Sequence, residues 1–214
     1  MSGQLRLSGG RKLKSPVGQG TRPTTARVRE AVMNLLASHL GGCYWLDLCS
    51  GSGVMGCEAL QSGARKVVAV ECNAKIARIC QANLIATASG LSQTSNIEVI
   101  RQDVLSWLRK GFYAAKFCEP WKGHNPGFNV VYFDPPYSSK LYSEVLKALL
   151  EGQWLQENAV VICEHAADFK LEAPLPWLEQ DRRIYGGSAL LLINPPKHYP
   201  VGTDSRQTQI VQAT

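Results

Sequence analysis

The segment Asp134-Pro135-Pro136-Tyr137 is the part of the chain whose residue types point most directly to chemistry. It follows an apolar run, Phe128 to Phe133, which is typical of a buried strand. Because proline fixes φ and donates no backbone N–H, we expect a rigid turn whose carbonyl oxygens are free to accept hydrogen bonds. The Asp134 carboxylate and the Pro135 carbonyl could accept both protons of an amine and direct its lone pair at an electrophile, while Tyr137 stacks on an aromatic base. An ordinary turn that caps a strand is the alternative.

A glycine-rich loop lies upstream, at the end of another apolar run. The residues Gly51 to Gly56 match the pattern G-x-G-x-x-G, and such glycines let a ligand lie against bare backbone at the start of a helix. Glu71 ends the next apolar run, 20 residues after Gly51, where its carboxylate could accept hydrogen bonds from ribose hydroxyls. By itself the pattern also fits the dinucleotide of a dehydrogenase, or a tight turn that binds nothing.

Acidic residues around this loop favour S-adenosylmethionine as the nucleoside. Asp47 lies four positions before Gly51, where it would repel a pyrophosphate but attract an ammonium and a sulfonium. Asp103 follows a third apolar run and could accept a hydrogen bond from an adenine amino group. The D-P-P-Y turn has no role in hydride transfer. The expected cofactor-binding residues are Asp47, Ser50, Gly51, Ser52, Gly53, Glu71, Asp103 and Val104.

These residues need a scaffold that brings strand ends together, and the remaining sequence predicts one. Apolar runs predict strands at 44–48, 67–71, 97–100, 128–133, 159–163 and 188–193. Between them, apolar residues at three- and four-residue spacing predict helices, with a further helix upstream of the first strand; the ranges are 24–40, 54–62, 74–87, 104–110 and 141–150. The alternation predicts an α/β, doubly wound, mostly parallel sheet, with ligands at the carboxyl ends of its strands.

Composition predicts a soluble, cytoplasmic body with a basic extension. A chain of 214 residues that is 45% hydrophobic can bury a core, and its apolar runs are far shorter than the roughly 20 residues of a membrane helix. The seven cysteines contain no C-x-x-C pair, so we expect free thiols and no metal site. Residues 1–29 hold seven basic and no acidic residues. This segment could bind a polyanion, or it could be a solvated tail without a partner. The expected parts are an N-terminal arm and helix at 1–41, a catalytic domain at 42–196 and a flexible tail at 197–214.

Three motifs together resemble those of one enzyme family. The segments Leu46 to Gly53 and Asp134 to Tyr137 resemble the motifs of Rossmann-like class I methyltransferases that act on exocyclic amines. The segment R-P-T-T-A-R-V-R-E at 22–30 resembles, more narrowly, the RsmD family, which methylates N2 of a guanine in bacterial small-subunit (16S) rRNA. The resemblance runs from about Leu5 to Ile193.

The resemblance implies a seven-stranded sheet and S-adenosylmethionine as methyl donor, with no metal. It implies that the catalytic residues Asp134, Pro135, Pro136 and Tyr137 hold the target guanine. It also implies that the partner is rRNA, free or in an assembling small ribosomal subunit, that the protein is a monomer, and that the RNA contacts are Arg11, Lys12, Arg22, Arg27 and Arg29. The chain departs from the family in a shorter segment at 9–13 and a longer connection at 111–127.

Two other functions remain open. A DNA adenine-N6 methyltransferase uses the same D-P-P-Y turn, but it is disfavoured because the chain has no separate domain for target recognition. A noncatalytic RNA-binding protein with this fold is disfavoured because the glycine loop and the D-P-P-Y turn are both intact.

Overall fold

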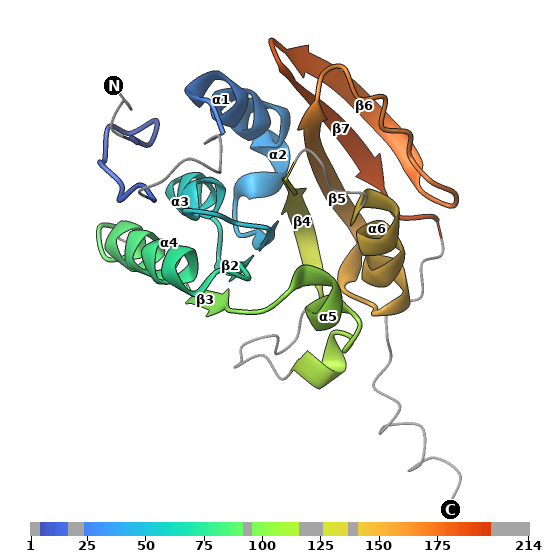
Figure 1. Ribbon diagram of the computed structural model, residues 1–214, viewed down its shortest axis with the longest axis horizontal. Coiled ribbons are helices and arrows are strands. Elements are labelled where there is room, and N and C mark those ends of the chain that lie inside the picture. The colour runs from blue at the N-terminus through green and yellow to red at the C-terminus, as the bar shows by residue number, and fades with distance from the viewer. Residues whose placement is uncertain (1–4, 17–23, 92–95, 116–125, 137–140, 198–214) are drawn as a thin grey trace, which may run out of the picture.

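A seven-stranded mixed sheet forms the centre of the computed structural model, which describes residues 5–16, 24–91, 96–115, 126–136 and 141–197 (Figure 1). The strands are β1 (Tyr44–Leu48), β2 (Lys66–Val70), β3 (Asn96–Ile100), β4 (Phe128–Phe133), β5 (Leu155–Ala166), β6 (Leu178–Tyr185) and β7 (Ser188–Asn194). Their order in the sheet is β3-β2-β1-β4-β5-β7-β6. Strands β1 to β5 run parallel, whereas β7 is antiparallel to both β5 and β6. The predicted α/β, mostly parallel architecture is confirmed.

Helices cover both faces of the sheet (Figure 1). One face carries α1 (Ala26–Leu35), α2 (Ala37–Leu40), α3 (Val54–Gln61) and α4 (Ala74–Ala88), and the other carries α5 (Val104–Leu108) and α6 (Leu141–Glu151). A short 3-10 helix, η1, spans Tyr113–Ala115. None of the helices in the described ranges is both long and apolar enough to cross a membrane.

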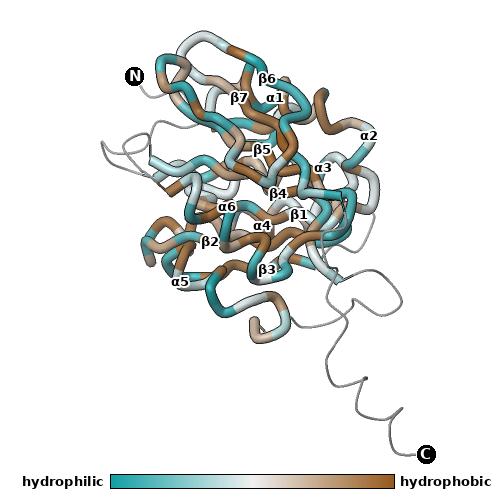
Figure 2. The backbone as a smooth tube through the Cα atoms, turned by 90° about the vertical axis from the view of Figure 1, so that its right-hand side faces the viewer, coloured by the Kyte–Doolittle hydropathy of each residue, from teal (hydrophilic) through white to brown (hydrophobic). Residues whose placement is uncertain are grey.

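The core lies in two layers, one on each face of the sheet. The central strands β1, β2 and β4 are mostly apolar and almost entirely buried, and their hydrophobic stretches run through the interior in Figure 2. Trp45 and Tyr132 stack on the face of α1 and α3, while Trp107 and Trp154 pack on the face of α5 and α6. The sheet is therefore held rigidly from both sides, which fixes the positions of its strand ends.

The N-terminal arm is part of this core. Residues 5–13 form a small hairpin, in which the N–H of Leu13 donates to the Leu5 carbonyl at 2.9 Å. The backbones of Arg6 and Lys12 form an antiparallel β-bridge. Leu5, Leu7 and Leu13 are buried in the same cluster as α1 and α3. The short segment at 9–13 thus still closes a hairpin, and the leucines that alternate with basic residues anchor it.

The structure differs from the sequence-based expectations in two elements. Strand β6 was not predicted, because it is largely polar and exposed and its place depends on pairing with β7. The single helix predicted at 24–40 is two helices, α1 and α2, separated at Leu36, where the backbone tightens and the N–H of His39 donates to the Leu36 carbonyl at 2.7 Å. The expected tail at 197–214 lies outside the described residues apart from Lys197.

Candidate active site

The register of the parallel strands brings the glycine loop and the D-P-P-Y turn together. Leu48 is paired with Val70 on one side and with Phe133 on the other. Asp134 therefore leaves the sheet beside the start of the glycine loop, and its N–H reaches the Leu48 carbonyl at 3.5 Å. Glu71 leaves the sheet on the opposite side of the loop. The carboxyl ends of three neighbouring strands thus meet at one edge, where open α/β sheets bind their ligands.

Two glycines of the loop are required by its geometry. Gly53, the N-terminal cap of α3, has φ of 75°, and a Cβ at this position would lie 2.6 Å from the Cys80 Sγ atom. Gly51 has φ of 54°, and no atom lies within 4 Å of where its Cβ would be. The loop therefore packs tightly against α4 at Gly53 and faces open space at Gly51, which leaves room for a ligand against the backbone.

Two buried carboxylates fix the shape of the loop. The Asp47 Oδ2 atom accepts from the N–H of Gly56 at 3.2 Å, and the Glu71 Oε2 atom accepts from the N–H of Gly51 at 3.0 Å. The Glu71 Oε1 atom also accepts from the N–H of Asn73 at 2.8 Å. Each carboxylate oxygen has a second lone pair, so Glu71 can still accept a hydroxyl of a bound ribose.

The other expected cofactor residues surround the same edge of the sheet. Asp103 caps α5, because its Oδ1 atom accepts from the N–H of Ser106 at 2.9 Å, and its side chain is exposed. Val104 is buried beneath it. The Ser50 hydroxyl lies 3.6 Å from the Cys80 Sγ atom, and the Ser52 carbonyl accepts from Asn83. These residues fit a nucleoside that carries hydroxyls, an amino group and positive charge.

The D-P-P-Y turn presents one half-buried carboxyl group. Asp134 is partly exposed, Pro135 is buried and Pro136 is exposed, whereas Tyr137 lies outside the described residues. Burial raises the pKa of Asp134 well above its usual range, and the nearby Glu164 and Asp47 raise it further. A hydrogen bond from the Thr24 side chain opposes this shift. The carboxyl group can therefore change its protonation state in response to a charged ligand.

Glu164 is a member of this site that the sequence analysis did not identify. It lies near the carboxyl end of β5, where it is 2% exposed and accepts a hydrogen bond from the Tyr132 hydroxyl. Its backbone carbonyl accepts from the Tyr142 hydroxyl at 2.8 Å. The available signal was an acidic residue directly after the apolar run Ala159 to Cys163, next to His165.

Acidic side chains are concentrated at this edge of the sheet. The pKa of Asp47 is raised to about 7, mainly by burial and in smaller part by the nearby Glu71, against the opposing hydrogen bond from Gly56. Asp47, Asp134 and Glu164 together would be stabilised in their ionised forms by a cation. The site is thus suited to a sulfonium and an ammonium and unsuited to a pyrophosphate. Within the described ranges, no three His, Cys, Asp or Glu side chains are placed so that they could hold one metal ion together.

The expected RNA-binding residues divide into two groups. Arg11, Lys12 and Arg27 are exposed, and Arg27 lies over the Tyr185 ring with 6.0 Å between guanidinium and centroid. Arg22 lies outside the described residues. The expectation for Arg29 is wrong: its side chain is 6% exposed and forms an ion pair with Glu58 at 3.1 Å, so its charge is used inside the protein.

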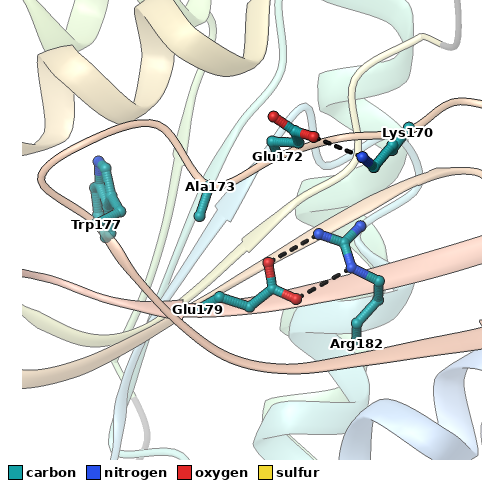
Figure 3. Close-up of a pocket in the computed structure, with 6 residues that line it drawn as sticks. All are labelled: Lys170, Glu172, Ala173, Trp177, Glu179 and Arg182. Atoms are coloured by element: carbon teal, nitrogen blue, oxygen red, sulfur yellow. Dashed lines mark hydrogen bonds and ion pairs between the residues drawn. The ribbon is translucent and has the colours of Figure 1, made fainter.

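A separate hollow of about 520 Å³ lies against the edge strand β6, which is separated from β1 by three other strands (Figure 3). Its charged residues pair with one another, Lys170 with Glu172 at 2.8 Å and Arg182 with Glu179 at 2.9 Å. Because these charges are already satisfied, the hollow offers little to a charged ligand and is not part of the candidate active site.

Comparison with known proteins agrees with this geometry. The family model described as "Conserved hypothetical protein 95" matches residues 1–194. Two relatives are named Ribosomal RNA small subunit methyltransferase D. The protein from Haemophilus influenzae is 33% identical, and the match covers 78% of this chain and 80% of the relative. The protein from Escherichia coli is 31% identical, and the match covers 89% of this chain and 90% of the relative. The solved structure of the E. coli protein yhhF covers 92% of this chain and 100% of its own, with 29% identity and a TM-score of 0.72. The resemblance to the RsmD family is thereby confirmed, and the chain belongs to that family of methyltransferases.

Proposed function

We propose that this protein transfers a methyl group from S-adenosylmethionine to the exocyclic N2 of a guanine in small-subunit rRNA. The observation that carries the proposal is the register of β1 and β4, which sets Asp134 beside the glycine loop at one edge of the sheet. Relatives named for methylation of the small-subunit rRNA support the choice of substrate.

The loop and the strand ends would hold the methyl donor. Backbone of Gly51 to Gly53 would contact its methionine part, Glu71 the ribose and Asp103 the adenine. When bound, S-adenosylmethionine supplies a methyl group activated by a positively charged sulfur. The carboxylates at this edge favour that charge, and the partly occupied oxygens of Glu71 retain capacity for the ribose hydroxyls.

The D-P-P-Y turn would orient the amine. The lone pair of an aromatic amine is delocalised into its ring, so the amine needs its protons held before the lone pair can point at a methyl group. The Asp134 carboxylate and the Pro135 carbonyl would accept those protons, and Tyr137 would stack on the base. Transfer of the methyl group would leave a neutral thioether on the donor and positive charge on the amine nitrogen. Asp134 would stabilise that charge and receive the proton that the nitrogen loses.

The exposed basic residues would contact the rRNA backbone. Arg11 and Lys12 lie on the N-terminal hairpin and Arg27 lies at the start of α1, and Arg22 belongs to the same motif. Phosphate contacts of this kind position the RNA without reading its sequence. We further propose that the protein acts as a monomer in the cytoplasm, on rRNA or on an assembling subunit.

The test is methyl transfer to three substrates in parallel. Labelled S-adenosylmethionine is incubated with small-subunit particles, naked rRNA and duplex DNA, and the product nucleosides are analysed. We expect N2-methylguanosine in the rRNA or the particles alone. Label in DNA as N6-methyladenine would instead support the DNA enzyme, and no label despite donor binding would support the noncatalytic protein.

An Asp134→Asn variant tests the assigned role of the turn. The amide keeps the size of the side chain but loses the charge, so kcat should fall at least about 100-fold, the scale of losing one preorganised electrostatic contact. The dissociation constant for S-adenosylmethionine, measured by calorimetry, should change far less than kcat, because Asp47 and Glu164 remain. Activity close to that of the unaltered protein would contradict the mechanism.

A further inference from the structure

Asn83 joins the N-terminal arm to the glycine loop through one buried side-chain amide. It lies on α4 and is 2% exposed. Its Oδ1 atom accepts from the N–H of Lys14, and its Nδ2 atom donates to the carbonyls of Lys14 and Ser52, each at 2.9 Å. Only one orientation of an amide can serve one N–H and two carbonyls in this arrangement. The side chain is therefore fixed between the arm and the loop.

On the loop side, this contact holds the peptide group between Ser52 and Gly53. Its carbonyl accepts from Asn83, and its N–H donates to the Ser50 carbonyl at 2.8 Å. Because a peptide group is planar, holding both of its polar ends fixes its orientation. Gly51 lies inside the same turn and faces open space, so a ligand has room there. A loop that already has its bound shape saves the cost of ordering when the ligand binds.

On the other side, the arm is fastened along α4, next to which it lies in Figure 1. The N–H and the carbonyl of Lys14 both pair with Asn83, and Arg11 donates to the Ala86 carbonyl at 3.0 Å. Leu13, directly before Lys14, is buried in the same cluster as side chains of α3 and α4. The packing of the arm therefore sets the position of Lys14, and Asn83 links that position to the loop.

Taking the function proposed above as its basis, we propose that Asn83 is a positioning residue for the methyl donor, which holds the glycine loop in its donor-binding shape and makes that shape depend on the docked N-terminal arm. Asn83 then acts through Ser52 and makes no contact with the donor. The arm would serve donor binding in addition to carrying positive charge for RNA.

The experiment compares Asn83→Ala with Thr87→Val. Thr87 lies one turn further along α4, is 1% exposed, and donates through its Oγ1 atom to the Asn83 carbonyl at 2.9 Å. Its valine variant therefore also loses a buried hydrogen bond but keeps the contacts of Lys14 and Ser52. Both variants should have lower melting temperatures than the unaltered protein.

Donor binding should separate the two variants. The dissociation constant for S-adenosylmethionine, measured by calorimetry without RNA, should rise about 5- to 10-fold in Asn83→Ala, the scale of one lost hydrogen bond. It should change less than about 2-fold in Thr87→Val. Equal dissociation constants in the two variants would overturn the proposal.

A variant of the arm tests whether the loop depends on it. Leu13→Ala loosens the arm beside Lys14, and it should raise the same dissociation constant by a smaller factor, about 3-fold. Added to Asn83→Ala it should have no further effect, because the link through which the arm acts is already lost. Full multiplication of the two effects would overturn the proposal. If Asn83→Ala does not fold, an unchanged dissociation constant in Leu13→Ala would overturn it as well.

Hydrogen exchange in the ligand-free protein separates this proposal from the proposed function. Exchange of the Gly53 amide, followed by NMR in labelled full-length protein, should be at least about 5-fold faster in Asn83→Ala and unchanged in Thr87→Val. If the unaltered protein binds the donor but methylates no rRNA, the proposed function fails, while calorimetry and exchange still decide the role of Asn83. Unchanged exchange of Gly53 in Asn83→Ala would disprove that role.

Discussion

Replacing Arg29 by methionine should destabilise the fold because it breaks a buried ion pair from one side. The side chains of Arg29 and Glu58 are 6% and 3% exposed, and the guanidinium donates to three oxygens. Removing one partner of such a pair costs about 3–5 kcal/mol, since the remaining charge stays buried. Glu58 keeps two contacts from the N–H of Ser8, at 3.1 and 3.3 Å, so we expect the lower end, about 3 kcal/mol. This is a large share of the 5–15 kcal/mol typical of a domain.

Urea denaturation followed by tryptophan fluorescence measures this loss. Arg27→Met is the matched control: Arg27 is exposed and lies over the Tyr185 ring, so the free energy of unfolding of this variant should change by less than about 1 kcal/mol. Adding Glu58→Gln to Arg29→Met should recover about 1–2 kcal/mol, because the amide removes the stranded charge but can still accept from Ser8. Equal stabilities of Arg29→Met and Arg27→Met would refute the reasoning.

Three further outcomes follow from the site. Gly53→Ala should cost about 1–3 kcal/mol and weaken donor binding, because its Cβ would meet the Cys80 Sγ atom at 2.6 Å at a positive φ; denaturation and calorimetry measure both, and Cys80→Ala should relieve only the clash. The pKa of Asp47 is raised to about 7 in the folded protein, so the native state binds the extra proton and stability should fall as pH rises from about 4 to about 7. Asp47→Asn should flatten that slope in urea titrations at several pH values, and an unchanged slope would exclude Asp47 as its source. Lys12→Gln combined with Arg27→Gln should lower the slope of log binding constant against log salt by up to about 1.4 for RNA, if both residues contact phosphates; an unchanged slope would place the RNA elsewhere.

The sequence was sufficient for those parts of the fold whose position is decided locally. Strands β1 and β4 are apolar runs interrupted only by Asp47 and Asn129, and α6 repeats its leucines and valine at helical spacing, so the strands and the helix were both visible in the sequence. Asp47, Glu71, Asp103 and Asp134 could be assigned to one edge because parallel strands end together. Strand β6 could not be predicted, because its exposed, charged residues do not form an apolar run and its place in the sheet depends on pairing with β7.

The contacts within the site depend on long-range register and could not be foreseen. Glu164 reaches the site because β5 pairs with β4. Arg29 was misassigned for the same reason. In a basic segment an arginine is expected to face solvent, but its partner, Glu58, lies on α3, 29 residues away.

The position of β7 has a consequence for the order in which the protein can be assembled. This strand, the last in the described chain, is inserted between β5 and β6, so both of those strands have an open edge until Ser188–Asn194 is made. During synthesis, β5 can dock on β4 early, but its other edge stays unpaired until β7 has been made. The strand that carries Glu164 therefore gains its second neighbour late, and a nascent chain would acquire a finished active site only after Ser188–Asn194 has been synthesised.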